Sequence, residues 1–203
     1  MHLYLIRHGQ TEANRQRVFQ GTTDFPLNET GVRQAHDIMA WLKDEPITAI
    51  YTSPMQRARE TAEPLAKAVN IVPVAVDSFH EVDCGRWEGV GFDQIVIDEP
   101  NLLGQWLTDP DVAAPDGESL GSVYRRVGPK LSDITANHAA SEGAVVIVAH
   151  GAVNRAILCH LLDIGPDRAF RFDQNNGCIN RFDFRNPHPP KLSYANLTAH
   201  LGD

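Results

Sequence analysis

The stretch from Ala144 to Ala149 constrains the fold more than any other part of the chain, because it reads Ala-Val-Val-Ile-Val-Ala without a polar residue. A strand with one face in water alternates apolar and polar residues, whereas a strand covered on both faces is apolar throughout. Strands of the second kind belong to parallel sheets that carry helices on both faces. The stretch therefore predicts a central strand of a covered, parallel sheet.

Strand and helix patterns alternate along most of the chain. Strands are expected over 1–6 and 47–52, at an edge over 71–76, which contains Pro73, and at an edge again over 177–184 and 191–197. Four longer helices are expected. The first runs from Asn28 or Thr30 to Leu42, the second covers 54–69 with Ser53 as its cap, and the others cover 119–138 and 152–162. Short helical pieces are expected at 92–97 and 102–107. Residues 10–27 predict a long functional loop. This order indicates an α/β fold with a mostly parallel sheet and one domain over 1–203.

The charge and the cysteines limit the partners and the compartment. A net charge of −8, with histidine neutral, argues against nonspecific binding to nucleic acid or to anionic membranes, because both need a basic surface. The start of the chain lacks the features of a secretory signal, and no window is long enough to span a membrane. The cysteines Cys84, Cys159 and Cys178 lack metal-ligand spacing, so we expect reduced thiols in a cytoplasmic protein.

Chemically capable side chains follow the predicted strands where each strand ends. Arg7 and His8 follow the first strand, Arg57 follows the second, Glu81 follows the third, and His150 follows the apolar strand. Ligands of open α/β sheets bind beyond the carboxyl ends of the strands. Two arginines, two histidines and one carboxylate at one edge fit phosphoryl transfer, which needs cations, a nucleophile and a proton donor.

Six segments of the sequence together resemble one known family. They are LYLIRHGQTEAN (3–14), FQGTTDFPLNETG (19–31), YTSPMQRARETA (51–62), FHEVDCGRWEG (79–89), PDGES (115–119) and VVIVAHGAVNRAIL (145–158). In this order they resemble the histidine phosphatase superfamily, in the branch of the phosphoglycerate mutases, the small broad-specificity phosphatases and the α-ribazole-phosphate-type phosphatases. The resemblance implies a three-layer α/β/α fold and phosphomonoester hydrolysis through a phosphohistidine, without cofactor or metal.

The resemblance also implies a role for each matching residue. His8 matches the nucleophile, Glu81 the general acid and base, and Arg7, Arg57 and His150 the phosphate pocket. Asn14 matches a further phosphate contact, and Gln20 and Gly21 match a loop that borders the phosphate and the substrate.

These residue types suit the reaction. A neutral imidazole is nucleophilic, and we expect a carbonyl near Gly9 to orient His8 through its other ring nitrogen. Arginine forks pair with phosphate oxygens, and a protonated His150 is expected to add a donor. Glu81 is preferred as the acid over its neighbours Asp83 and Glu88, because only Glu81 aligns with the motif. The histidines lack metal-ligand spacing, so no metal site is expected.

Other readings stay open at the level of sequence. One alternative is a mutase, which would begin with the same phosphohistidine, although the compact segment after Glu81 favours a phosphatase. Another is a relative that binds phosphorylated ligands without turnover. Such a relative would have lost site residues that are present here. The aromatic residues Phe19, Trp87, Phe92, Trp106 and Tyr124 are expected to pack the loops near the site. In the alternative reading, Phe19 and Trp87 flank the organic part of the substrate.

A strand at 177–184 would allow a homodimer across a two-fold axis. The substrate is expected to be a small phosphorylated metabolite.

Overall fold

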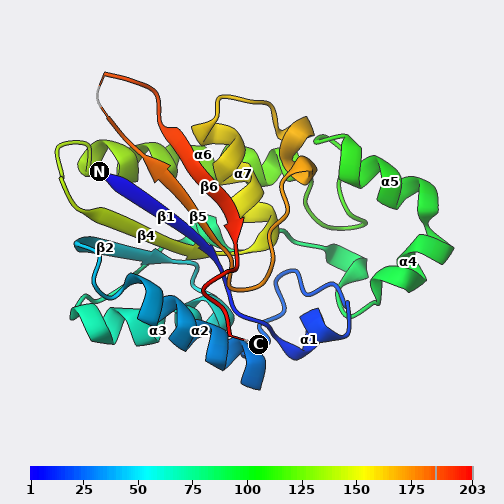
Figure 1. The fold of residues 1–203 in the computed structure, drawn as a ribbon. Coiled ribbons are helices and arrows are strands. Elements are labelled where there is room, and N and C mark those ends of the chain that lie inside the picture. Colours follow the sequence, from blue (N-terminus) through cyan, green and yellow to red (C-terminus); the bar gives the residue numbers. More distant parts are fainter. Residues whose placement is uncertain (186, 203) are drawn as a thin grey trace.

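A six-stranded sheet forms the centre of the molecule, in the order β3-β2-β4-β1-β5-β6 (Figure 1). The computed structural model describes residues 1–185 and 187–202. The strands are β1 (His2–Arg7), β2 (Ile47–Thr52), β3 (Val74–Ala75), β4 (Ala144–Ala149), β5 (Ile179–Asp183) and β6 (Lys191–Leu197). The pairs among β1 to β4 are parallel, whereas β5 runs antiparallel to β1 and β6 antiparallel to β5. The predicted mostly parallel sheet is confirmed.

Helices cover both faces of this sheet, as the apolar β4 predicted (Figure 1). Helices α2 (Glu29–Leu42) and α3 (Gln56–Val69) pack on the face that carries Tyr4 and Ile6. Helices α6 (Leu120–Asn137) and α7 (Gly151–Leu161) pack on the face that carries Leu3 and Leu5. The side chains of β1 alternate between two apolar clusters, so the three layers share one central sheet.

The helix starts follow the capping chemistry in two places and depart from it in a third. Asn28 caps α2 by accepting from the Gly31 amide at 2.9 Å, and Ser119 caps α6 by accepting from Ser122. The predicted cap Ser53 is wrong. Helix α3 begins at Gln56, after Met55, because the Ser53 hydroxyl is bonded instead to His150 at 2.7 Å.

The remaining elements lie between these layers and at the rim. Strand β3 is shorter than the predicted strand over 71–76, but it does lie at the sheet edge, as Pro73 indicated. The predicted loop over 10–27 contains a short helix, α1 (Glu12–Arg15). Helices α4 (Phe92–Asp98) and α5 (Pro100–Thr108) occupy the predicted short helical pieces, and 3-10 turns occur at Asp77–Phe79, Gly85–Trp87 and Pro166–Arg171.

Two further expectations concern the surface. The strand at 177–184 does not offer a free edge for a homodimer, because β5 is hydrogen-bonded to β1 on one side and to β6 on the other. That route to pairing across a two-fold axis was wrong, and the free edge on that side belongs to β6. Within the described residues, no helix combines the length and the apolar character that crossing a membrane requires.

Candidate active site

A cavity of about 360 Å³ opens at the carboxyl ends of the parallel strands, where the strand-end residues meet. It brings together residues that lie far apart in the sequence. Of the predicted site residues, its lining includes Arg7, His8, Asn14, Gln20, Gly21, Arg57 and Glu81. His150 lies just behind this surface, with its ring centroid 5.1 Å from that of His8.

His8 is fixed in one orientation by its own turn of backbone. The ring is buried, with 1% of its surface exposed, and its Nδ1 lies 2.7 Å from the Gly9 carbonyl oxygen. A carbonyl oxygen only accepts, so Nδ1 carries the proton and Nε2 keeps its lone pair in the neutral ring. The expectation that a carbonyl near Gly9 orients His8 is confirmed. Gly9 is held in turn, since its amide donates to the Thr61 hydroxyl at 2.9 Å.

The electrostatic surroundings keep His8 neutral. Burial lowers the pKa of His8 well below its ordinary value, and the charges of Arg57 and Arg7 lower it further, against a smaller opposing effect of the Gly9 hydrogen bond. A neutral imidazole is the nucleophilic form. The same cations that attract a phosphate therefore also keep the Nε2 lone pair free of a proton.

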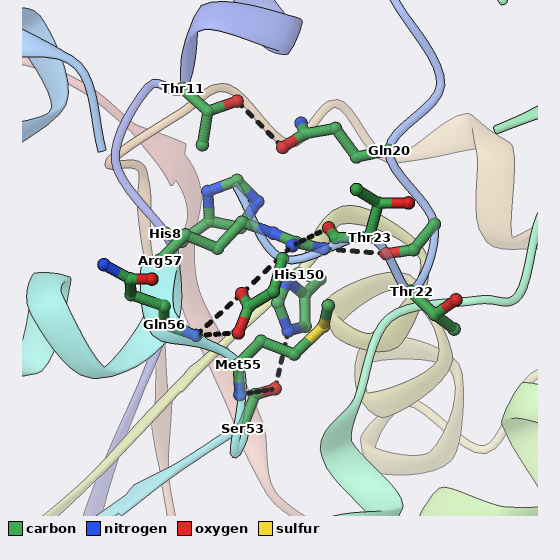
Figure 2. Close-up of polar contacts among 12 residues, drawn as sticks. His8, Thr11, Gln20, Thr22, Thr23, Ser53, Met55, Gln56, Arg57 and His150 are labelled. Carbon is green, nitrogen blue, oxygen red and sulfur yellow. Dashed lines mark hydrogen bonds and ion pairs between the residues drawn. The ribbon is translucent and has the colours of Figure 1, made fainter. Parts of the chain in front are cut away.

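Arg57 is a wholly buried cation that is fixed by backbone carbonyls. Its Nη1 donates to the Thr23 oxygen and its Nη2 to the Gly21 oxygen, both at 2.9 Å (Figure 2). Its Nε is buried without a hydrogen-bond partner among the described residues, and the carboxylate of Asp24 lies 3.8 Å from Nη1. Burial is the main cause that lowers the pKa of this guanidinium.

Arg7 is a second guanidinium next to His8, and it is less buried than Arg57. Its Nη1 donates to the Gln174 carbonyl, and its Nε is buried and unpartnered within the part of the chain that the structure describes. A buried N–H donor without an acceptor is costly, and the Nε atoms of both arginines are in this state among the described residues, so an anion that accepts from them would stabilise the site. The geometry around His8 is thus that of an anion site.

His150 is a buried residue next to Ser53. Its Nε2 lies 2.7 Å from the Ser53 hydroxyl, whereas its Nδ1 is buried and has no partner in the described chain (Figure 2). Burial lowers the pKa of His150 well below its usual range, and the charges of Arg57, Arg7 and Arg126 add to this effect. This effect applies to the site without a phosphate, so the expectation that a protonated His150 donates to a bound phosphate stays a prediction.

Glu81 reaches the cavity from the loop after β3. Its Oε1 accepts from the Val82 amide at 2.9 Å, and its Oε2 accepts from the Ala152 amide at 3.4 Å, in the first turn of α7. The rival carboxylates do not line the cavity. Asp83 accepts from the Gly85 amide, and Glu88 is bound by Thr22 and Thr23.

Asn14 and Gln20 present amide groups whose oxygens are already occupied. The oxygen of Asn14 accepts from Thr11 and from Asn176, and the oxygen of Gln20 accepts from the Thr11 hydroxyl at 2.8 Å (Figure 2). The NH₂ groups of both side chains are therefore left as donors at the cavity. This arrangement suits a phosphate, which only accepts.

Gly21 has a strict conformational requirement. Its φ is +51°, and a Cβ there would stand 2.0 Å from the Glu88 carboxylate. That carboxylate accepts from the backbone and hydroxyl groups of both Thr22 and Thr23, so it holds the loop against which Arg57 rests.

Sequence reasoning missed several residues that build the site. Ser53 bonds His150, Thr61 bonds Gly9, and Asn176 donates to the His8 carbonyl and to Asn14. Arg155 also lines the cavity. Arg155 could have been found from sequence, because it stands one helical turn after the strand end at His150, whereas Asn176 lies in a loop far along the chain and gave no signal.

The outer half of the cavity is aromatic. Phe19, Phe92, Trp106 and Phe170 line it, and Phe19 lies 5.7 to 6.1 Å from the rings of Trp87, Phe92 and Trp106. The reading in which Trp87 flanks the substrate was wrong, because Trp87 is buried behind Phe19. Tyr124 is not part of this group. It stacks on His160 at 3.6 Å.

Two other observations on the described chain concern a second cavity and a metal site. A larger hollow of about 680 Å³ runs along α3 and β3, but its lining contains no histidine or cysteine. Among the described residues there is also no cluster of three or more histidines, cysteines or acidic residues that would hold a metal.

Known proteins are similar over nearly the whole chain. Phosphoserine phosphatase 1 from Hydrogenobacter thermophilus is 32% identical, over 99% of this chain and 94% of the relative. The solved structure of phosphoserine phosphatase from Entamoeba histolytica, in complex with 3-phosphoglyceric acid, is 30% identical with a TM-score of 0.85 and covers 98% of each chain. That of a mycobacterial glucosyl-3-phosphoglycerate phosphatase, in complex with VO₃, is 28% identical with a TM-score of 0.87 and covers 97% of this chain and 99% of the other.

These likenesses agree with the resemblance found in the sequence. The predicted enzyme class, a phosphoric monoester hydrolase, is confirmed by the family and by relatives and structures named as phosphatases. The family model matches residues 3–197, and the chain therefore belongs to the histidine phosphatase superfamily, branch 1.

Proposed function

We propose that this enzyme hydrolyses phosphate monoesters of small metabolites in two steps, through a phosphohistidine on Nε2 of His8 and without a metal. The observation that carries this proposal is the state of His8. Its Nδ1 is bonded to Gly9, its ring is neutral, and Arg7 and Arg57, whose Nε atoms have no partner among the described residues, line the same cavity. Nucleophile and anion clamp are thus arranged before any substrate arrives.

In the first step, the Nε2 lone pair attacks phosphorus while the bond from phosphorus to the leaving oxygen breaks. Glu81, which lines the cavity, gives its proton to that oxygen, so the alcohol leaves neutral. Arg7, Arg57 and the NH₂ groups of Asn14 and Gln20 hold the three phosphoryl oxygens. The Gly9 carbonyl stabilises the positive charge that develops on the ring, because it accepts from Nδ1.

In the second step, water replaces the alcohol. Glu81, now a carboxylate, takes a proton from the water as its oxygen attacks phosphorus, and the bond from phosphorus to Nε2 breaks. His8 regains its lone pair, Glu81 regains its proton, and inorganic phosphate leaves. The dianionic phosphoryl group also supplies the negative charge that favours a proton on the nearby His150.

The aromatic residues of the outer cavity support a substrate whose organic part is at least partly apolar. Phe19, Phe92 and Trp106 line the same cavity as His8 and offer apolar ring surface to the organic part of a substrate. Relatives named for phosphoserine and for a phosphoglycerate ester indicate small phosphorylated metabolites as the class. A cytoplasmic location is part of the proposal, since Cys84, Cys159 and Cys178 are buried free thiols.

The mutase alternative shares the first step and differs in the acceptor. A mutase keeps water from the phosphohistidine and returns the phosphoryl group to a bound acid. A binding-only relative would lack turnover altogether.

The test uses purified enzyme with p-nitrophenyl phosphate and a panel of phosphorylated metabolites, with a chelator present throughout. We expect release of inorganic phosphate, loss of turnover in His8→Ala, and labelled phosphate trapped on the wild-type protein at alkaline pH but not on His8→Ala. Turnover by His8→Ala near the wild-type rate would refute the nucleophile. Labelling of wild type without phosphate release would favour the mutase, and neither signal in a folded protein would favour the binding-only relative.

A further inference from the structure

Arg155 is a third guanidinium in the cavity, and the two steps proposed above do not use it. It lies on α7, where its Nε donates to the Phe172 carbonyl at 2.9 Å and its Nη1 to the Gly151 carbonyl at 3.1 Å. Its Nη2 donates to no atom of the described residues, and it forms no ion pair with a carboxylate in that part of the chain. The backbone bonds fix its position and leave one side of the fork unused.

Arg155 lies close to Glu81 and to the aromatic wall of the cavity. A Cβ built on Gly151 would stand 3.2 Å from Arg155 Nη1 and 3.7 Å from both Arg7 Nε and Glu81 Oε2, so these three side chains surround one glycine. The guanidinium carbon of Arg155 lies 5.3 Å from the centre of the Phe170 ring, which is part of the aromatic wall. Arg155 is thus near both the proposed proton donor and an aromatic residue of the cavity wall.

Arg155 is the guanidinium of the inner cavity that is left without an anionic partner. In the proposed reaction Arg7 and Arg57 hold the phosphate, and Arg57 also has the carboxylate of Asp24 at 3.8 Å. Glu81 is the only carboxylate in the described lining, and it must be protonated to act as the acid. Arg155 forms no ion pair with a carboxylate of the described residues. Arg17, at the rim, is already paired with Asp93 at 3.2 Å, and burial together with the charge of Arg7 lowers the pKa of Arg155.

We propose that Arg155 binds a second acidic group of the substrate, a carboxylate carried on the leaving group a few atoms from the ester oxygen. Arg155 would then be the residue that makes the enzyme prefer phosphate esters of hydroxy acids to those of uncharged alcohols. The arginine fork suits a carboxylate, and Arg155 is partly buried, which reduces the screening of such a pair by water. This inference rests on the proposed function, because it assigns a subsite to that same cavity.

The test compares two competitors that differ only in this group. 3-Phosphoglycerate carries a carboxylate where glycerol 3-phosphate carries a hydroxymethyl group. Each is measured as an inhibitor of p-nitrophenyl phosphate hydrolysis, which works whether or not the competitor is itself turned over. For wild type we expect the inhibition constant of 3-phosphoglycerate to be lower by about tenfold or more, the scale of one hydrogen-bonded charge pair.

Three variants separate the subsite from other roles. In Arg155→Gln the two constants should become equal within about twofold, while inhibition by inorganic phosphate should stay within about threefold of wild type. Arg155→Lys keeps a charge, should fold if Arg155→Gln does not, and should retain part of the preference. Arg17→Gln removes the other guanidinium near the aromatic wall and should leave the preference intact.

Several outcomes would overturn the inference. Equal constants in wild type would do so while hydrolysis of p-nitrophenyl phosphate still supported the proposed function. A preference that survives Arg155→Gln, or that disappears in Arg17→Gln, would also do so. A uniform loss of affinity for both competitors and for phosphate in Arg155→Gln would show that Arg155 only supports the backbone at Phe172 and Gly151.

Discussion

Two buried histidines next to two arginines should make the fold sensitive to mild acid. The pKa values of His8 and His150 are both lowered well below the ordinary histidine value, in each case chiefly by burial. When the pH falls below about 6.5, the unfolded chain binds a proton at each position but the folded chain does not. Stability is therefore present above that pH and is lost as the pH falls toward the folded-state pKa values.

The magnitude follows from the number of protons. Each such histidine costs about 1.4 kcal/mol of unfolding free energy per pH unit below its unfolded pKa, so the pair costs about 3 kcal/mol per unit. His200 adds to this, because burial lowers its pKa as well. Most carboxylates of the unfolded chain titrate below about pH 4.5, so the interval between about pH 5 and 6.5 isolates the histidines.

Urea unfolding at several pH values in this interval measures the effect. His8→Asn and His150→Asn should each reduce the slope of unfolding free energy against pH by about 1.4 kcal/mol per unit. His36→Asn, at an exposed position of α2, serves as the matched control for replacing a histidine by asparagine. Parallel pH profiles for wild type, His8→Asn and His150→Asn would refute the reasoning, because the site would then bind protons as the unfolded chain does.

Three further predictions concern single contacts. Thr61→Val leaves the buried Gly9 amide without its acceptor. The free energy of unfolding in urea should fall by about 1–3 kcal/mol, and turnover should be slower. Unchanged stability would mean that the contact does not hold the nucleophile. Glu81→Gln should slow release of an alkyl alcohol far more than release of p-nitrophenol, which needs no proton, and an equal loss for both leaving groups would contradict the acid role. Gly21→Ala should displace Glu88 and raise the inhibition constant of vanadate by about tenfold or more. A wild-type inhibition constant would show that the loop tolerates the change.

The sheet could be predicted from the sequence wherever burial dominated the residue choice. The strands at 47–52, 144–149 and 191–197 have the predicted bounds, and 144–149, whose pattern is wholly apolar, is buried at every position. Strand β3 was predicted too long, since isolated β-propensity does not show that only Val74 and Ala75 find partners on β2. Ser53 was misjudged because a local rule for helix caps competed with a long-range bond to His150, and the long-range bond prevailed.

The same distinction applies to the site. His8, Arg57 and Glu81 could be predicted to meet, since each follows a strand and parallel strands end together. The proton on Nδ1 of His8 and the low pKa of His150 depend on burial and on nearby charges that belong to other segments. Asn176 reaches the site from a loop before β5, and nothing in its surroundings in the sequence marks it.

The strand order has a consequence for synthesis of the chain. Strands β1 and β2 do not pair with each other, because β4 lies between them and is hydrogen-bonded to both. A nascent chain therefore exposes Arg7, His8 and Arg57 on separate segments until residue 149 has left the ribosome. Only then can the sheet close, and a long sequence separation of this kind slows folding. His8, Arg7 and Arg57 are therefore brought together only late in translation. Ribosome-bound fragments that end before β4 should have no phosphatase activity.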